Sequence, residues 1–258
     1  MPDQPEISPG DAAKLAASRA AVALVRDGKK LGLGTGSTAV IMVRELAARA
    51  KAEGLTLRCA ATSKATAELA SSLGLAGESL DQIGWLDMTI DGADEVDPDL
   101  NLIKGGGGAH LREKIVARAS DRMVVIADPG KVVETLGAFH LPVEVIPFGA
   151  QVTERLIREA LEALDLGHRP ILMRQRDGRP YVTDEGNHIF DLALEAIPDP
   201  ARLARVLSDI PGVVEHGLFL GICDLALIGQ SDGNVIELHS EMADDETPDF
   251  LFGEGEDE

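Results

Sequence analysis

The chain has 258 residues, of which 45% are hydrophobic but only 3% aromatic, and its formal net charge at pH 7 is -20. A core of Ala, Val, Leu and Ile is typical of helices packed on a sheet rather than of an aromatic-rich β-sandwich. The negative charge disfavours nucleic acid or an anionic membrane as the main partner, because phosphate backbones select basic surfaces. No apolar run approaches the roughly 18 residues of a membrane span, and the acidic N-terminus does not resemble a signal peptide. We therefore expect a cytoplasmic protein of one or two domains.

The two cysteines and the acidic C-terminal segment are not expected to have a catalytic role. Cys59 and Cys223 form no metal-ligand pattern, so we expect both to be reduced thiols in the core. From Glu241 onward there are nine acidic residues and no Lys or Arg. Residues 241–258 are therefore predicted to be a disordered, solubilising tail.

The first half of the chain alternates helix and strand patterns. The expected elements are a helix over 12–26, strand 30–33, helix 39–52, strand 55–60, helix 65–73, strand 85–90, a helix from about Ala109, and strand 123–127. Such alternation predicts a parallel, doubly wound α/β sheet.

The pattern changes after residue 139. The expected elements are a short strand between Pro142 and Pro147, helix 151–164, hairpin strands 171–174 and 181–184, strand 187–192, helix 200–208 and strand 213–220. This order predicts a compact α+β domain over 140–214. It is inserted into a first domain of residues 1–139, which 215–240 complete with strands over 224–228 and 235–238.

One segment, from Met88 to Ala117, carries most of the reactive side chains. Asp91 follows a predicted strand, at the sheet edge where open α/β sheets bind ligands. Asp94, Lys104 and four glycines come next, and Glu113 lies in the early turns of the following helix. Carboxylates held together shift one another's pKa values, so one of them can act as a base near neutral pH while Lys104 offsets the charge.

Some residues of this segment also allow other interpretations. Glu95, Asp97 and Asp99 are expected to form a solvated acidic turn. A divalent metal site is disfavoured, because the spacing fits no EF-hand loop and Lys104 would repel the ion. His110 could be a general acid, but a lone His beside a glycine loop is more often structural. In the helix itself Leu111, Ile115 and Val116 are expected to form the apolar face.

A second glycine-rich loop, Gly34 to Thr38, connects the strand over 30–33 to the next helix. Its amides, its hydroxyls and the helix N-terminus together suit a phosphate group. The spacing Gly32-x-Gly34-x-x-Ser37 lacks the third glycine of a dinucleotide fingerprint, and the Lys of a nucleoside-triphosphate loop is absent. A small phosphorylated metabolite therefore fits better than a nicotinamide cofactor or a nucleotide.

Several motifs occur in a recognisable order: Gly32-Leu-Gly-Thr-Gly-Ser-Thr38, Asp91-Gly-Ala-Asp-Glu95, Lys104-Gly-Gly-Gly107, Arg112-Glu-Lys-Ile115, Asp128 with Lys131, Leu141-Pro-Val-Glu-Val-Ile-Pro147 and Pro211-Gly-Val-Val214. Together they resemble type A ribose-5-phosphate isomerase, from about residue 9 to residue 238. The resemblance implies a Rossmann-like domain carrying a smaller ferredoxin-like domain. It also implies a homo-oligomer, often a dimer, that uses no metal or organic cofactor.

The resemblance further implies the chemistry, which is isomerisation of ribose 5-phosphate and ribulose 5-phosphate through an enediolate in the non-oxidative pentose phosphate pathway. Glu113 is then the base, Lys104 and the glycine amides stabilise the oxyanion, and Asp91 with Asp94 moves protons among the hydroxyls. The substrate-binding residues that it implies are Lys14, Thr35, Gly36, Ser37, Thr38, Asp91, Gly92, Ala93, Asp94, Lys104, Gly105, Gly106, Gly107 and Lys131.

Other functions explain the motifs less well. An amino-sugar-phosphate deaminase or a coenzyme A transferase of the same superfamily does not explain Asp91, Lys104 and Glu113 together. A sugar-phosphate sensor usually carries a DNA-binding segment, and no basic helix-turn-helix candidate is present.

The sequence departs from the family pattern at two positions, because Gly108 and His110 replace small or aliphatic residues of the family. His110 precedes Glu113 by three residues on one helical face, where it could alter that carboxylate's pKa.

Overall fold

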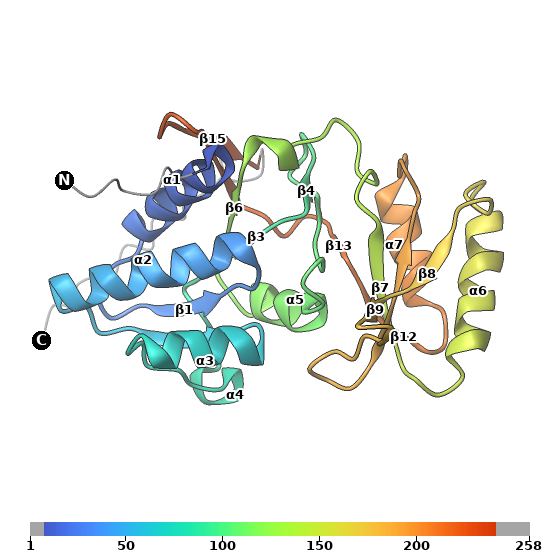
Figure 1. Ribbon diagram of the computed structural model, residues 1–258, viewed down its shortest axis with the longest axis horizontal. Coiled ribbons are helices and arrows are strands. Elements are labelled where there is room, and N and C mark those ends of the chain that lie inside the picture. The colour runs from blue at the N-terminus through green and yellow to red at the C-terminus, as the bar shows by residue number, and fades with distance from the viewer. Residues whose placement is uncertain (1–7, 241–258) are drawn as a thin grey trace, which may run out of the picture.

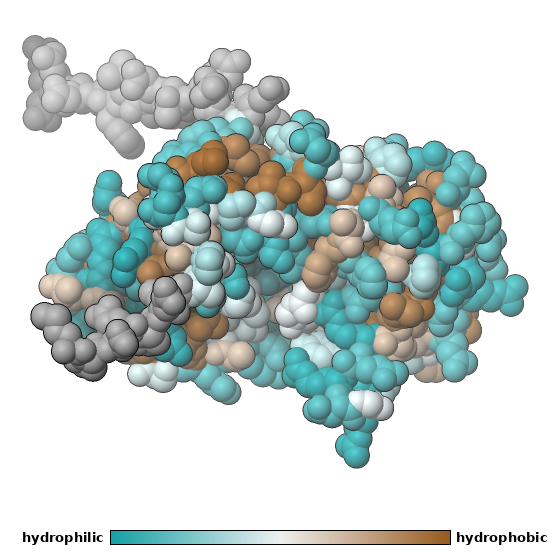
Figure 2. Space-filling view, turned by 45° about the horizontal axis from the view of Figure 1, so that its top comes forward, coloured by the Kyte–Doolittle hydropathy of each residue, from teal (hydrophilic) through white to brown (hydrophobic). Residues whose placement is uncertain are grey.

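The computed structural model describes residues 8–240, in which the elements form two lobes (Figure 1). The predicted acidic tail, 241–258, lies outside the described residues. Figure 2 shows hydrophilic residues over most of one face, with hydrophobic residues in separate patches. Among the described residues, no helix combines the length and the apolar character needed to cross a bilayer.

The larger lobe is built on a six-stranded sheet. Its strand order is β15-β14-β6-β3-β1-β2, with bounds Lys30–Leu33 (β1), Arg58–Ala61 (β2), Met88–Gly92 (β3), Met123–Ala127 (β6), Leu225–Gly229 (β14) and Val235–His239 (β15). All neighbours are parallel except β14 and β15. Every residue of β6 and β14 is buried, as expected of parallel strands that helices cover on both faces.

Helices pack on both faces of this sheet: α1 and α2 on one side, and α4 and α5 on the other, while α3 lies beside the edge strand β2 and contacts α2 (Figure 1). From α1 to α5 their bounds are Pro9–Ala23, Ser37–Glu53, Lys64–Ser72, Leu80–Ile83 and His110–Arg118. Side-chain capping and glycine conformation define several of the helix ends. The Ser63 side chain accepts from the amide of Thr66 at the start of α3, and Gly54 ends α2 in the left-handed conformation.

The smaller domain is an antiparallel four-stranded sheet with two helices. Strand order β12-β7-β11-β8 joins Leu141–Val145 (β7), Ile171–Met173 (β8), His188–Leu192 (β11) and Val213–His216 (β12). Helices α6 (Ala150–Glu162) and α7 (Pro200–Ser208) contribute to its separate apolar core. The β-α-β-β-α-β order is ferredoxin-like. The predicted fold class, a Rossmann-like α/β sheet with an inserted α+β domain, is confirmed by these two sheets.

Two short pieces of sheet complete the fold. Strands β4 (Glu95–Val96), β5 (Leu102–Ile103) and β13 (Leu218–Phe219) form a small sheet of their own. A hairpin joins β9 (Gln175–Arg176) to β10 (Arg179–Pro180). Its turn residues Asp177 and Gly178 both have positive φ, 53° and 72°, as a type I′ turn requires.

Several predicted elements are corrected by the structure. The strand expected over 85–90 begins at Met88, because Trp85 is 53% exposed and its indole donates to Asp121 instead of packing in the sheet. The hairpin strand expected over 181–184 is β10, Arg179–Pro180. The strand expected over 213–220 is divided into β12 and β13, which pair in different sheets.

The remaining corrections concern which side chains are buried. Glu95 and Asp97 are buried rather than solvated, since Glu95 accepts from the amides of Gly137 and Phe139. In α5, Ile115 is 50% exposed, and the buried side chains are His110, Glu113, Val116 and Ala117. The helix therefore turns His110 and Glu113 inward, which its apolar residues did not predict.

Candidate active site

A cavity of about 420 Å³ opens at the carboxyl ends of β1, β3 and β6, the edge at which open α/β sheets bind ligands. It is lined by Lys14, Thr35, Gly36, Ser37, Thr38, Gly92, Ala93, Asp94, Lys104, Gly105, Gly106, Gly107, Glu113, Asp128, Gly130 and Lys131. The structure thus brings all but one of the residues predicted from the sequence to a single cavity. Asp91 is the exception, and Asp128 and Gly130 were not predicted.

The inner end of the cavity holds three buried titratable side chains. The Lys104 ammonium lies 3.0 Å from Asp91 Oδ2 and 3.6 Å from Glu113 Oε1, and it also donates to the carbonyl oxygen of Gly92. Strand β3, the end of β5 and the first turn of α5 supply these groups. Glu113 lines the cavity, and its buried Oε2 has no hydrogen-bond partner among residues 8–240.

Asp91 lies behind Lys104 and does not line the cavity. Its Oδ1 accepts from the amides of Thr35 at 3.0 Å and Gly92 at 2.7 Å, and its side chain is fully buried. A Cβ at Gly34 would lie 2.0 Å from Asp91 Oδ1, so only glycine leaves room there. Asp91 therefore holds Lys104 and the Gly34 to Thr38 loop in place.

Burial sets the protonation of Glu113. It raises the pKa of this carboxyl from 4.5 to about 8, with Lys104 opposing the rise and Asp91 and Asp94 adding to it. Burial lowers the pKa of Lys104, but the carboxylates of Asp91 and Glu113 outweigh this, so its pKa is raised overall. The site therefore combines a charged lysine with a carboxyl whose pKa lies near neutral pH, as a general base requires.

The raised pKa predicts a pH dependence of stability. Between pH 4.5 and about 8 the folded chain keeps a proton on Glu113 that the unfolded chain releases. The stabilisation from this group is complete below pH 4.5 and is lost as the pH rises through about 8. The melting temperature of wild-type protein should therefore fall more steeply between about pH 5 and about pH 9 than that of Glu113→Gln. Parallel melting curves for the two proteins would contradict the assignment.

The outer end of the cavity has the features of a phosphate site. The N-terminus of α2 faces it, and its N-cap, Gly36, has φ 113° and no side chain to accept the first-turn amides. Lys131 follows β6 in a 3-10 turn over Pro129–Lys131, and Lys14 comes from α1. Although the chain has a net charge of -20, both of these lysines line the cavity.

Asp128 and Gly130 are lining residues that the sequence predictions did not assign to the substrate. The Asp128 side chain accepts from the Gly130 amide at 3.0 Å and caps the turn that carries Lys131. The signal was present in the sequence, because Asp128-Pro-Gly is a turn that follows a predicted strand.

His110 is fully buried, and neither of its ring nitrogens has a hydrogen-bond partner among the described residues. Burial and the charges of Lys114 and Arg174 lower its pKa to about 3, so its ring is neutral near pH 7. Its Nε2 lies 3.9 Å from Glu144 Oε2, and His110 is absent from the cavity lining. The main causes of the raised pKa of Glu113 are burial and the charges of Lys104, Asp91 and Asp94 rather than His110. Cys59 and Cys223 are free, buried thiols, as expected.

No group of three or more His, Cys, Asp or Glu in residues 8–240 is placed to hold a metal ion. The cavity instead combines cations, amides and carboxyls, which suits a phosphorylated substrate with exchangeable protons. The sequence matches the family of ribose 5-phosphate isomerase A, or phosphoriboisomerase A, over residues 58–233, more than half of the chain. The chain belongs to this family.

Relatives and solved structures of the family agree over most of the chain. The ribose-5-phosphate isomerase A of Dinoroseobacter shibae is 59% identical over 230 residues, which are 89% of this chain and 88% of the relative. Ribose 5-phosphate isomerase A from Methanocaldococcus jannaschii has 39% identity and a TM-score of 0.79, covering 89% of this chain and 98% of that one. The enzyme from Plasmodium falciparum has 34% identity and a TM-score of 0.83, covering 90% and 99%.

Proposed function

We propose that the chain interconverts ribose 5-phosphate and ribulose 5-phosphate at this cavity, through an enediolate, with Glu113 as the proton shuttle. The observation that carries the proposal is a buried carboxyl whose pKa is raised to about 8 and which borders a cavity with a phosphate site at its other end. A carboxylate fixed on one face of the substrate can remove a proton from C2 of the open-chain aldose and return it to C1.

The other charged residues at the cavity have separate roles in the proposed reaction. Lys104, charged and 2% exposed, stabilises the oxyanion together with amides of the glycine loop. Asp94 lines the cavity and is placed to move protons among the substrate hydroxyls during ring opening. Asp91 was also expected to take part in these transfers. Because Asp91 lies behind Lys104, we assign it the indirect role of holding that lysine.

A solved relative binds a compound that, like the proposed intermediate, has a phosphate at one end. A D-ribose-5-phosphate isomerase in complex with phospho-erythronic acid is 33% identical, with a TM-score of 0.82, and covers 90% of this chain and all of that one. Phospho-erythronic acid carries a carboxylate at one end and a phosphate at the other. The cavity has a matching polarity, with Lys104 at its inner end and Lys131 and the α2 N-terminus at its outer end.

The phosphate assignment predicts the effect of removing one cation. Lys131→Ala should raise KM for ribose 5-phosphate about tenfold or more, because about 1.4 kcal/mol of charge-assisted binding is lost. Lys51→Ala is the matched control, since Lys51 is exposed in the last turn of α2 and changes the net charge equally. Unphosphorylated ribose should be a very poor substrate. Equal turnover of ribose and ribose 5-phosphate would contradict the assignment of a phosphate site.

The activity itself is tested by a direct isomerase assay on purified, chelator-treated protein, with both sugar phosphates as starting material. Conversion in both directions is expected. A protein that binds ribose 5-phosphate but does not convert it would instead be a sensor with the same cavity.

We also propose that the protein is a cytoplasmic homo-oligomer, most simply a dimer. Three exposed apolar side chains, Phe148, Val152 and Ile146, lie near the start of α6, and Phe148 is 89% exposed. Such residues favour contact with another surface. We propose the same division into residues 1–139 with 215–240 and residues 140–214, because most of the smaller domain's apolar cluster lies within 140–214, although Ile103, Leu136 and Leu218 also contribute to it. Light scattering at several protein concentrations measures the oligomeric state.

A further inference from the structure

The glycine loop, Gly105 to Gly108, is contacted by two side chains of the smaller domain. Nη1 of Arg174 donates to the carbonyl oxygens of Gly105 at 2.8 Å and Gly106 at 3.2 Å. The hydroxyl of Tyr181 donates to the carbonyl oxygen of Gly107 at 3.2 Å. Three successive carbonyl groups of the loop are therefore bonded to the smaller domain.

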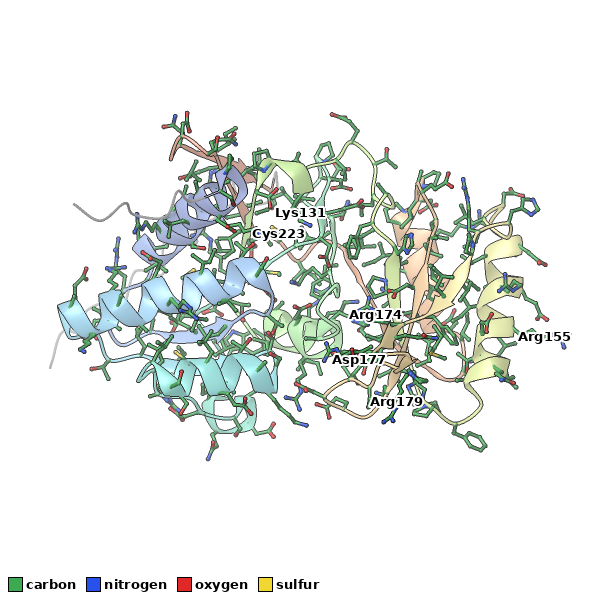
Figure 3. All side chains as sticks on the ribbon, in the orientation of Figure 1. Lys131, Arg155, Arg174, Asp177, Arg179 and Cys223 are labelled. Carbon is green, nitrogen blue, oxygen red and sulfur yellow. The ribbon has the colours of Figure 1, made fainter. Side chains whose placement is uncertain are left out.

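Both contacting side chains are themselves held in place. Arg174 Nε and Nη2 donate to the two carboxylate oxygens of Asp191 at 2.9 and 2.5 Å, and both side chains are largely buried. This bidentate geometry leaves only Nη1 for the loop. The Tyr181 ring occupies the space beside Gly108, where an added Cβ would lie 2.5 Å from it. Figure 3 shows Arg174 between the smaller domain and α5.

The carbonyl contacts determine where the amides of the loop point. In a planar trans peptide the C=O and the following N–H point in opposite directions. The Gly106 amide donates to Asp94 Oδ2 at 2.7 Å, and the Gly108 amide donates to the Gly105 carbonyl at 2.9 Å. Within residues 8–240 the Gly107 amide donates to no protein atom, and Gly107 lines the cavity. The bond between Arg174 and the Gly106 carbonyl therefore directs a free N–H away from the smaller domain.

We propose that Arg174 and Tyr181 are positioning residues that orient the Gly107 amide to donate a hydrogen bond to the enediolate oxyanion. The inference rests on the proposed function and extends it to the smaller domain, which acts on the reaction without touching the substrate. A donor fixed before the reaction stabilises the developing charge without reorganising. The effect is therefore expected in the chemical step rather than in phosphate binding.

The test compares Arg174→Met and Tyr181→Phe with wild type. Arg174→Met should lower kcat by roughly 10- to 100-fold while KM for ribose 5-phosphate changes less than about threefold. Inhibition by phospho-erythronic acid, whose carboxylate resembles the enediolate, should weaken. Inhibition by ribitol 5-phosphate, which has no carbonyl, should not change. Tyr181→Phe keeps the ring and removes one hydrogen bond, so its kcat should fall by about three- to tenfold. This variant tests the proposal even if Arg174→Met fails to fold.

Arg155→Met is the matched control. Arg155 is also an arginine of the smaller domain, it pairs with Glu159 at 3.0 Å, and it lies on α6 away from the loop (Figure 3). Its kcat should equal that of wild type. Unchanged kcat in folded Arg174→Met and in Tyr181→Phe would overturn the proposal, as would equal weakening of the two inhibitors. An inactive wild-type protein would instead refute the proposed function, so the two failures are distinguishable.

Discussion

Glu113→Gln should lower kcat by about 10²- to 10⁴-fold, the contribution typical of a general base. The amide keeps the shape of the side chain and removes the group that accepts the proton. Glu113 is the residue for which burial, pKa and access to the cavity coincide. Binding of ribitol 5-phosphate should survive, because the phosphate contacts lie at the other end of the cavity. Steady-state kinetics and inhibition by that compound measure the two quantities separately.

The isotope content of the product gives an independent measurement on wild-type protein. In heavy water, part of the product should carry solvent deuterium at the carbon that receives the proton, because a carboxylic acid exchanges with water before it returns the proton. A hydride shift would transfer the original hydrogen without solvent label. Near-normal turnover by Glu113→Gln would place the base elsewhere, and Asp94, which also lines the cavity, would be the next residue to replace.

Lys104→Met should combine a loss of activity with a loss of stability. Removing a preorganised oxyanion donor lowers kcat by about 10²- to 10³-fold. The substitution also leaves the fully buried Asp91 without its cation, and breaking a buried ion pair in this way costs about 3–5 kcal/mol. Denaturant unfolding and steady-state kinetics on the same preparation measure both effects.

The double variant Asp91→Asn with Lys104→Met separates these two contributions. It removes the unpaired charge, so it should recover part of the stability that Lys104→Met loses while remaining inactive. If the double variant is no more stable than Lys104→Met, the ion pair at 3.0 Å is not the origin of the destabilisation. Recovery of activity would show that Lys104 is not required for the reaction.

The accuracy of the sequence predictions follows from the range of the interactions involved. Strands β1 and β6 and helix α7 have the predicted bounds, because apolar periodicity and Pro or Gly boundaries specify them locally. The strand expected over 213–220 was wrong, since only pairing with β7 on one side and β5 on the other divides it into β12 and β13. The buried state of Glu95 likewise depends on amides more than 40 residues away.

For the candidate site, the sequence by itself determined the set of reactive residues and the loops that carry them. The chemistry needs particular residue types, and these can be read directly from sequence motifs. They are the glycines at 34 and 105 to 107, the carboxyls of Asp91, Asp94 and Glu113, and Lys104. Tertiary structure alone decided that Asp91 lies behind Lys104, that burial raises the pKa of Glu113 to about 8, and that Arg174 reaches the glycine loop. These properties depend on desolvation and on contacts between distant segments, which no local pattern specifies.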